Sequence, residues 1–144
     1  MLGALNTIEI EELLKSQTIG RIGCHANDTT YIVPVSYAYD GEYVYAHSRD
    51  GMKINMMRQN PEVCFEVEEI VNMANWESVI AWGEFEELTN EEERNKAMEL
   101  LIKQLMPFIV SETVLPSHGL GTMKVAVVYR IRLSKKVGRF EKQG

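Results

Sequence analysis

Residues 30–48 read TYIVPVSYAYDGEYVYAHS and contain two runs of strand-forming residues on either side of Asp40-Gly41. Side chains in the first run alternate between two faces with the period of a β-strand. Asp-Gly between two such runs favours a two-residue hairpin, because a type I′ turn requires positive φ at both central residues. The expected register makes the following pairs: Tyr39 with Glu42, Ser36 with Tyr45, and Pro34 with His47.

Further strands and helices are predicted on both sides of this hairpin. Alternating or apolar runs indicate six strands, at residues 19–24, 30–39, 42–48, 63–68, 79–85 and 124–133. Three helices are expected: one from its cap at Thr7 to about Gln17, one over 51–59 capped by Asp50, and one over 90–106 with Thr89 and Glu92 in capping-box spacing. Residues 107–121 are irregular and predict a loop that carries function or an interface.

These elements predict a mainly β (α+β) fold built on a six-stranded antiparallel barrel with peripheral helices. The strands are joined chiefly by hairpins, which favours antiparallel pairing, and closure into a barrel removes exposed sheet edges. A length of 144 residues fits a single domain covering residues 1–144. Because a small barrel has a filled interior, we expect ligands on its outside or at a subunit junction.

Charge and cysteine content limit the possible partners. Fifteen Lys and Arg against 21 Asp and Glu give a net charge of −6, which opposes binding to nucleic acid or to an anionic membrane. No apolar run approaches the roughly 20 residues that cross a bilayer. Cys24 and Cys64 are the only cysteines and lack CxxC spacing, so reduced thiols, no metal and a cytoplasmic location are expected.

A candidate anion site lies where the strand 42–48 leads into the helix 51–59. Ser48, Arg49 and Lys53 cluster there, and the unpaired N–H groups and dipole of a helix N-terminus attract anions. Lys53 would supply a point charge and Ser48 a hydroxyl donor. Asp50 opposes this interpretation, because its carboxylate could cap the same N–H groups and repel a phosphate. A solvated helix cap is the alternative.

Pro34 and His47 are the other informative residues. A proline inside a strand marks an edge or bulge and leaves neighbouring backbone groups open to a planar heterocycle, although it also fits a simple barrel edge. The expected register places His47 beside the anion site, where it could donate to a ligand or act as an acid; a structural histidine is the alternative. Hydrolase motifs such as GxSxG, Walker loops and HExxH are absent from the sequence.

The sequence resembles the pyridoxamine 5′-phosphate oxidase-like family of FMN-binding split barrels with Greek-key-like connections, especially its branch of nitroimidazole-resistance (Nim) proteins. The stretches that carry the resemblance are Gly20-Arg21-Ile22-Gly23, Pro34-Val35-Ser36-Tyr37, Tyr45-Ala46-His47-Ser48 with Lys53, Asn60-Pro61-Glu62-Val63-Cys64-Phe65-Glu66-Val67, and Ser78-Val79 before Gly83. Met52 stands where the oxidase itself often has an arginine, so either Arg49 or an arginine from elsewhere in the protein is expected to assist Lys53.

This resemblance implies an FMN cofactor held at the interface of a homodimer. Residues 32–36 would run along the flavin ring, 46–48 and Lys53 would hold the ribityl chain and phosphate, and Ser78-Val79 would approach the flavin bound by the other subunit. The cofactor-binding residues so implied are Val33, Pro34, Val35, Ser36, Ala46, His47, Ser48, Arg49, Met52, Lys53, Ser78 and Val79.

The function implied by the resemblance is an FMN-dependent oxidoreductase that acts on a small molecule, with His47 as the candidate catalytic residue. The Trp and Arg motif that holds a pyridoxal-type substrate in the oxidase is not found in this sequence, so oxidation of pyridoxamine phosphate is not expected. Two alternatives remain: a non-catalytic flavin carrier or sensor, and a split barrel that binds haem or a deazaflavin.

Overall fold

The computed structural model describes residues 1–108 and 127–144. Their elements, in chain order, are β1 (Leu2–Ala4), α1 (Thr7–Ser16), β2 (Ile19–Ala26), β3 (Thr29–Ser36), β4 (Ala38–Tyr39), β5 (Tyr43–Ser48), α2 (Met52–Gln59), β6 (Glu62–Asn72), β7 (Asn75–Glu87), α3 (Glu91–Leu105), a 3₁₀ turn (Met106–Phe108) and β8 (Val127–Glu141). Most of the expected loop 107–121 and the start of the expected last strand lie outside the described residues.

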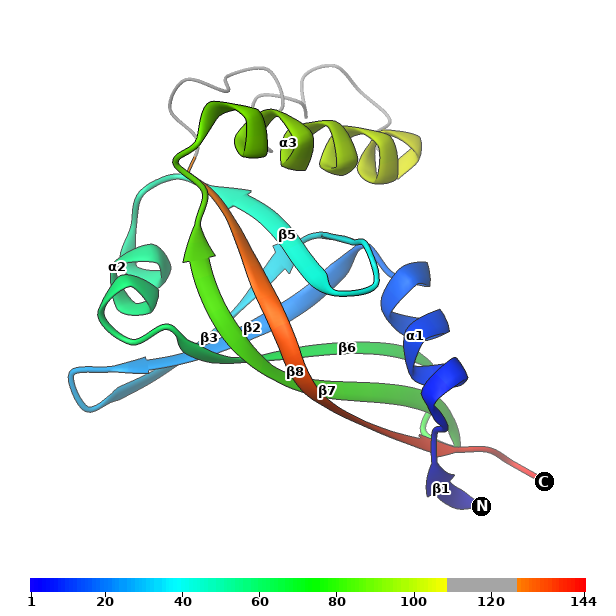
Figure 1. The fold of residues 1–144 in the computed structure, drawn as a ribbon. Helices are drawn as coiled ribbons and strands as arrows, with labels where there is room; N and C mark the ends of the chain where they lie inside the picture. The colour runs from blue at the N-terminus through cyan, green and yellow to red at the C-terminus, as the bar shows by residue number, and fades with distance from the viewer. Residues whose placement is uncertain (109–126) are drawn as a thin grey trace.

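A single antiparallel sheet dominates the fold, with the three helices at its periphery (Figure 1). Its strand order is β3-β2-β6-β7-β8-β5-β4, and β1 pairs with the far end of β8. The mainly β, antiparallel prediction is confirmed. The described sheet has eight strands instead of six, because β1 was not foreseen and the run 30–39 forms two strands.

Tyr37 is the residue at which the run 30–39 divides into two strands. It joins β3, at one edge of the sheet, to β4, at the other edge, so the sheet must curl to bring its two edges together. Among the described strands β3 pairs with β2 alone, and the barrel is therefore split along β3. The Tyr37 side chain is buried, its hydroxyl donates to the carbonyl of Leu14 (2.7 Å), and its ring meets the edge of Phe65 (4.9 Å between centroids).

The expected hairpin register was wrong. Asp40 accepts hydrogen bonds from the backbone N–H groups of Glu42 (2.9 Å) and Tyr43 (2.7 Å), and of these turn residues only Gly41 has a positive φ, 101°. The Asp40 N–H donates to the Tyr43 carbonyl (3.2 Å), so the two residues of the turn are Gly41 and Glu42, one position later than expected. The observed pairs are these: Tyr39 with Val44, Ala38 with Tyr45, Pro34 with Arg21, Ser36 with Ile19, and His47 with Val128.

All three helix caps also differ from the predictions. Asn6, instead of Thr7, caps α1 and forms a capping box with Glu9. Asn90 caps α3 by accepting from the N–H of Glu93 (3.1 Å). Gly51, instead of Asp50, occupies the cap position of α2. In each case the cap lies one residue from the expected position.

Two apolar clusters hold these elements together. The larger fills the barrel between the inward faces of the strands and α1, and includes Leu14, Ile22, Phe65 and Ile131. The smaller packs α3 against Ala38 and Val128 through Met98 and Leu101. Because the interior is filled by side chains, a ligand must bind at the barrel's surface, at its split or between subunits.

Candidate functional site

The helix α2 is fixed to the hairpin formed by β2 and β3. Asn60, just after the helix, donates its side-chain N–H to the carbonyl of His25 (2.8 Å). Asn27, in the hairpin turn, donates to the Gln59 side chain (2.8 Å). These two bonds anchor the C-terminal end of α2, so its N-terminal end has a defined position relative to β3.

The N-terminus of α2 lacks a side-chain cap. Gly51 has no side chain to accept hydrogen bonds, and the first turn contains no acidic residue. Asp50 instead accepts from Arg58 through both carboxylate oxygens (3.1 Å each). Asp50, which was expected to cap this helix, therefore does not cap it. The first-turn N–H groups keep the anion-binding character of a helix N-terminus.

Lys53 lies in this first turn and is half-buried. Within residues 1–108 and 127–144, its ammonium makes no hydrogen bond and no ion pair. Burial lowers the pKa of Lys53, whereas the neighbouring Cys24 thiol raises it slightly. Desolvation of a charge without a counter-ion is unfavourable, so this lysine favours an anionic ligand.

Ser48, Arg49 and Met52 accompany Lys53 at the junction between β5 and α2. The Ser48 hydroxyl donates to the carbonyl of Arg49 (2.7 Å), and the Arg49 and Met52 side chains are exposed. His47 is half-buried at the end of β5, and the neighbouring Ala46 is fully buried. The structure thus brings together the predicted residues of segment 46–53.

The open edge of β3 is the second part of the site. Ala26 and Thr29 flank a two-residue turn whose φ values are 52° and 60°, so they form a hydrogen-bonded pair. Alternation then directs the N–H and C=O groups of odd-numbered residues towards β2, and the Tyr37 N–H continues this pattern by donating to the Thr18 carbonyl (3.0 Å). The backbone groups of even-numbered residues point to the open edge.

Pro34 and Ser36 are therefore the predicted β3 residues whose backbone faces the open edge. Pro34 lacks an N–H group, and at this position no bond of the ladder is lost. The N–H of Ser36 and the C=O groups of Ile32 and Pro34 can meet a ligand there. Val33 and Val35 turn their backbone groups to β2 and their side chains to the core.

Ser78 and Val79 lie on β7, two strands away from β2 in the sheet order. The Val79 side chain is fully buried, so it can offer only its backbone to a ligand. Ser78 faces outward, is half-buried, and donates its hydroxyl to Glu66 (3.1 Å). The structure therefore places these two residues on a surface separate from the α2 site.

Arg21 and Glu66 are two residues of this surface that sequence reasoning did not nominate as site residues. Arg21 pairs with Glu66 (3.3 Å) and with Glu68 (2.7 Å), and it lies directly opposite Pro34. The charged residues at alternate positions of β6 were visible in the sequence. Their partners depend on strand register, which the sequence did not reveal.

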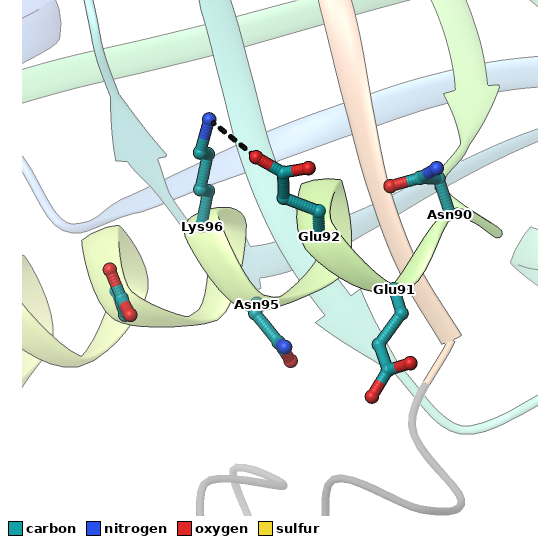
Figure 2. A pocket seen from close by; sticks show the side chains of 6 residues that line it. Asn90, Glu91, Glu92, Asn95 and Lys96 are labelled. Atoms are coloured by element: carbon teal, nitrogen blue, oxygen red, sulfur yellow. Dashed lines mark ion pairs between the residues drawn. The ribbon is translucent and has the colours of Figure 1, made fainter.

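Among the hollows of the described structure, two lie elsewhere on the surface and bear on the choice of ligand site. One, of about 580 Å³, opens over Gly23 on the outward sheet face and is lined by Ile32, Cys64 and Trp82, among others. Figure 2 shows the other, at the start of α3, where Lys96 pairs with Glu92 (3.4 Å) and further glutamates line the wall. Its excess of carboxylates disfavours an anionic ligand.

The described residues offer neither a metal-binding cluster nor a membrane-spanning helix. In that part of the chain, no three His, Cys, Asp or Glu side chains gather where they could hold a metal ion. Likewise, no described helix has both the length and the apolar character needed to span a bilayer.

The described residues form a split, mainly β antiparallel barrel, with a lysine in the uncapped first turn of a short helix that follows a strand. The sequence model of the family described as pyridoxamine 5′-phosphate oxidase matches residues 6–140. The chain therefore belongs to the pyridoxamine 5′-phosphate oxidase family, as the sequence motifs predicted.

Known relatives agree with this assignment. An uncharacterised protein of Rhizobium meliloti is 35% identical over 80 residues, and the match spans 56% of this chain and about half, 53%, of that protein. The structure of a FAD-binding protein from Mesorhizobium loti has a TM-score of 0.77 and 29% identity over 99% of both chains.

Two more distant structures share the fold. A FAD-binding protein from Mycobacterium smegmatis has a TM-score of 0.72 at 21% identity, covering 99% of this chain and 100% of its own. A proposed 5-nitroimidazole antibiotic resistance protein from Bacteroides thetaiotaomicron has a TM-score of 0.76 at 18% identity, covering 97% and 87%.

Proposed function

We propose that this chain is a homodimeric flavoprotein that binds FMN between the N-terminus of α2 and the open edge of β3. The observation that carries the proposal is Lys53, a half-buried ammonium that has no acidic partner among the described residues and lies in an uncapped helix turn. The FAD-binding relative from Mesorhizobium loti, similar over almost the whole chain, supports a flavin as the ligand.

The donors of the site fit a flavin mononucleotide. A phosphate dianion would receive the charge of Lys53 and the first-turn N–H groups of α2, with Ser48 and Arg49 beside it. The heterocycle would meet the Ser36 N–H and the carbonyls along the edge of β3. FAD contains the same ribityl-phosphate unit, so acid extraction and chromatography of the bound flavin will distinguish the two cofactors.

The protein's part in catalysis would be to bind and orient. A bound flavin supplies hydride and electron transfer, which no side chain of this site provides. Lys53 and the start of α2 would fix the phosphate end, and β3 would fix the ring. His47 is the candidate proton donor at the end of β5. If His47→Ala leaves both flavin affinity and turnover unchanged, this role for His47 is refuted.

The reaction we propose is reduction or oxidation of a small molecule. The flavin-loaded protein should sustain turnover when given a reduced nicotinamide cofactor and a nitroaromatic acceptor. A single reduction of the bound flavin without sustained turnover would instead identify a carrier or sensor.

The outward face of the sheet from β3 through β2, β6 and β7 to β8 supports the homodimer. Ile32, Ile80, Trp82 and Val137 expose apolar side chains on this face, next to the hollow over Gly23. Exposed apolar patches of this kind mark association surfaces. Ser78 lies on the same face, where it would reach the flavin held by the partner subunit.

A mixing experiment tests this shared site. Lys53→Met and Ser78→Ala homodimers should each bind FMN weakly. When subunits are exchanged, each mixed dimer will have one site with both native residues and one with neither. Recovery of tight FMN binding in the mixture is the expected result. No recovery, with exchange demonstrated by a mass-tagged subunit, would show that Lys53 and Ser78 do not come from different subunits.

A further inference from the structure

Four polar residues form a connected cluster on the outward face of β2, β6 and β7. Arg21 contacts Glu68 (2.7 Å) and Glu66 (3.3 Å), and the Ser78 hydroxyl donates to the other oxygen of Glu66 (3.1 Å). Strand register accounts for the cluster, since Arg21 lies opposite Glu66 and Ser78 lies opposite Glu68. Each Glu66 oxygen thus has one defined partner.

The cluster lies between two parts of the proposed site. Arg21 is opposite Pro34 on the open-edge strand, and Ser78 is the residue proposed to meet the partner's flavin. The Glu66 side chain is 22% exposed and that of Arg21 is 47% exposed, so the carboxylate is the more enclosed group. A second subunit on this face would enclose it further.

The bond from Ser78 to Glu66 determines what Ser78 can offer a ligand. A serine hydroxyl has one proton and two lone pairs, whereas an ionised carboxylate only accepts. Because the proton is committed to Glu66, Ser78 presents lone pairs and can only accept. On an oxidised isoalloxazine ring the matching donor is N3–H, and the ribityl hydroxyls are the other flavin donors.

We infer that Glu66 is a positioning residue that holds the Ser78 hydroxyl as a hydrogen-bond acceptor towards the flavin of the partner subunit. This inference rests on the proposed function. Arg21, on β2, holds the Glu66 carboxylate in place. That carboxylate in turn orients the hydroxyl of Ser78 on β7.

The protonation state of Glu66 gives the inference a second, independent signature. Burial raises the pKa of this carboxyl, and the neighbouring Glu68 raises it further, while Ser78 and Arg21 oppose the shift. Ile80, which lies opposite Glu66 on β7, is uncharged, and Arg139 on β8 lies opposite Ser78. When Glu66 is protonated it can donate to Ser78, so flavin affinity should fall as the pH falls through this pKa.

Three variants test the inference by FMN titration, followed through the quenching of flavin fluorescence. Glu66→Gln can donate to Ser78 and should weaken FMN binding roughly 3- to 10-fold. Glu68→Gln is the matched control, because it removes the same charge from the same arginine while leaving the bond from Ser78 to Glu66 in place. Its effect should be smaller, and it should keep a pH dependence that Glu66→Gln loses, moved to lower pH because Glu68 raises the pKa of Glu66.

The third variant, Ser78→Ala, completes a double-mutant cycle with Glu66→Gln. Glu66→Gln should have no further effect on FMN affinity in the Ser78→Ala background, provided that thermal melts show all variants folded. Equal effects of Glu66→Gln and Glu68→Gln, or a full effect of Glu66→Gln without Ser78, would overturn the inference. In that case Lys53→Met would still weaken FMN binding; a chain that binds no flavin at all overturns both this inference and the proposed function.

Discussion

Replacing Lys53 by methionine is the sharpest perturbation of the proposed phosphate site. Methionine keeps most of the aliphatic stem of lysine, so packing on the barrel is disturbed little. The ammonium it removes is half-buried and has no carboxylate partner among the described residues. A ligand phosphate would supply a counter-ion that the described residues do not.

The expected loss follows from the strength of a charged hydrogen bond. Such a bond contributes about 1.5–3 kcal/mol, because one partner is ionised. That corresponds to FMN binding weakened roughly 10- to 150-fold. The upper end is expected if the bound phosphate is enclosed, since Lys53 is already partly shielded from water.

The assay compares two ligands and two variants. Riboflavin has the same ring without the phosphate, so Lys53→Met should weaken FMN binding strongly and riboflavin binding little. Lys96→Met is the control for removal of a lysine, because Lys96 is exposed on α3 and pairs only with Glu92 in the described structure. It should leave both affinities unchanged.

The same variant should change the stability of the flavin-free protein in the opposite direction. Burial lowers the pKa of Lys53, so the folded state disfavours its charged form, and wild-type stability should rise as the pH rises through that pKa. Lys53→Met should be more stable at neutral pH and should lack this rise. Equal loss of FMN and riboflavin affinity, or unchanged FMN affinity, would refute the phosphate assignment.

Three further predictions concern the helix start and the barrel. Asp50→Asn removes a carboxylate from the start of α2 and should strengthen FMN binding roughly 2- to 5-fold in the same titration. Tyr37→Phe loses a buried 2.7 Å hydrogen bond and should lower the free energy of unfolding by about 0.5–1.5 kcal/mol, whereas Tyr129→Phe, whose buried hydroxyl has no partner in the described structure, should be neutral or stabilising in urea melts. A Cβ on Gly83 would clash with the backbone carbonyl of Arg132, so Gly83→Ala should cost about 1–3 kcal/mol by the same measurement, and an unchanged midpoint would contradict this packing.

The class of fold could be predicted from the sequence because side-chain alternation reports directly on strands. The register could not, because the Asp40 side chain accepts from the N–H groups of Glu42 and Tyr43, and Asp40 precedes the tight turn instead of lying within it. Tyr37 has the sequence environment of a strand residue, and only the curled sheet shows that it joins the two edges.

The candidate site, too, could be predicted from the sequence only in part. Lys53 and Ser48 could be identified because they are close in sequence to a helix start. Arg58 binds the Asp50 carboxylate and so keeps it from capping α2, and Ser78 donates to Glu66. Both contacts link residues that are brought together only by folding. Neither has a local sequence signal.

The most direct test of the account is a titration of the purified, flavin-free chain with FMN, followed by gel filtration and a visible absorption spectrum. The account predicts a yellow dimer that retains one FMN per chain, with riboflavin retained far less well. A colourless protein peak after FMN has been offered in excess would contradict the central claim, even if the barrel is correct.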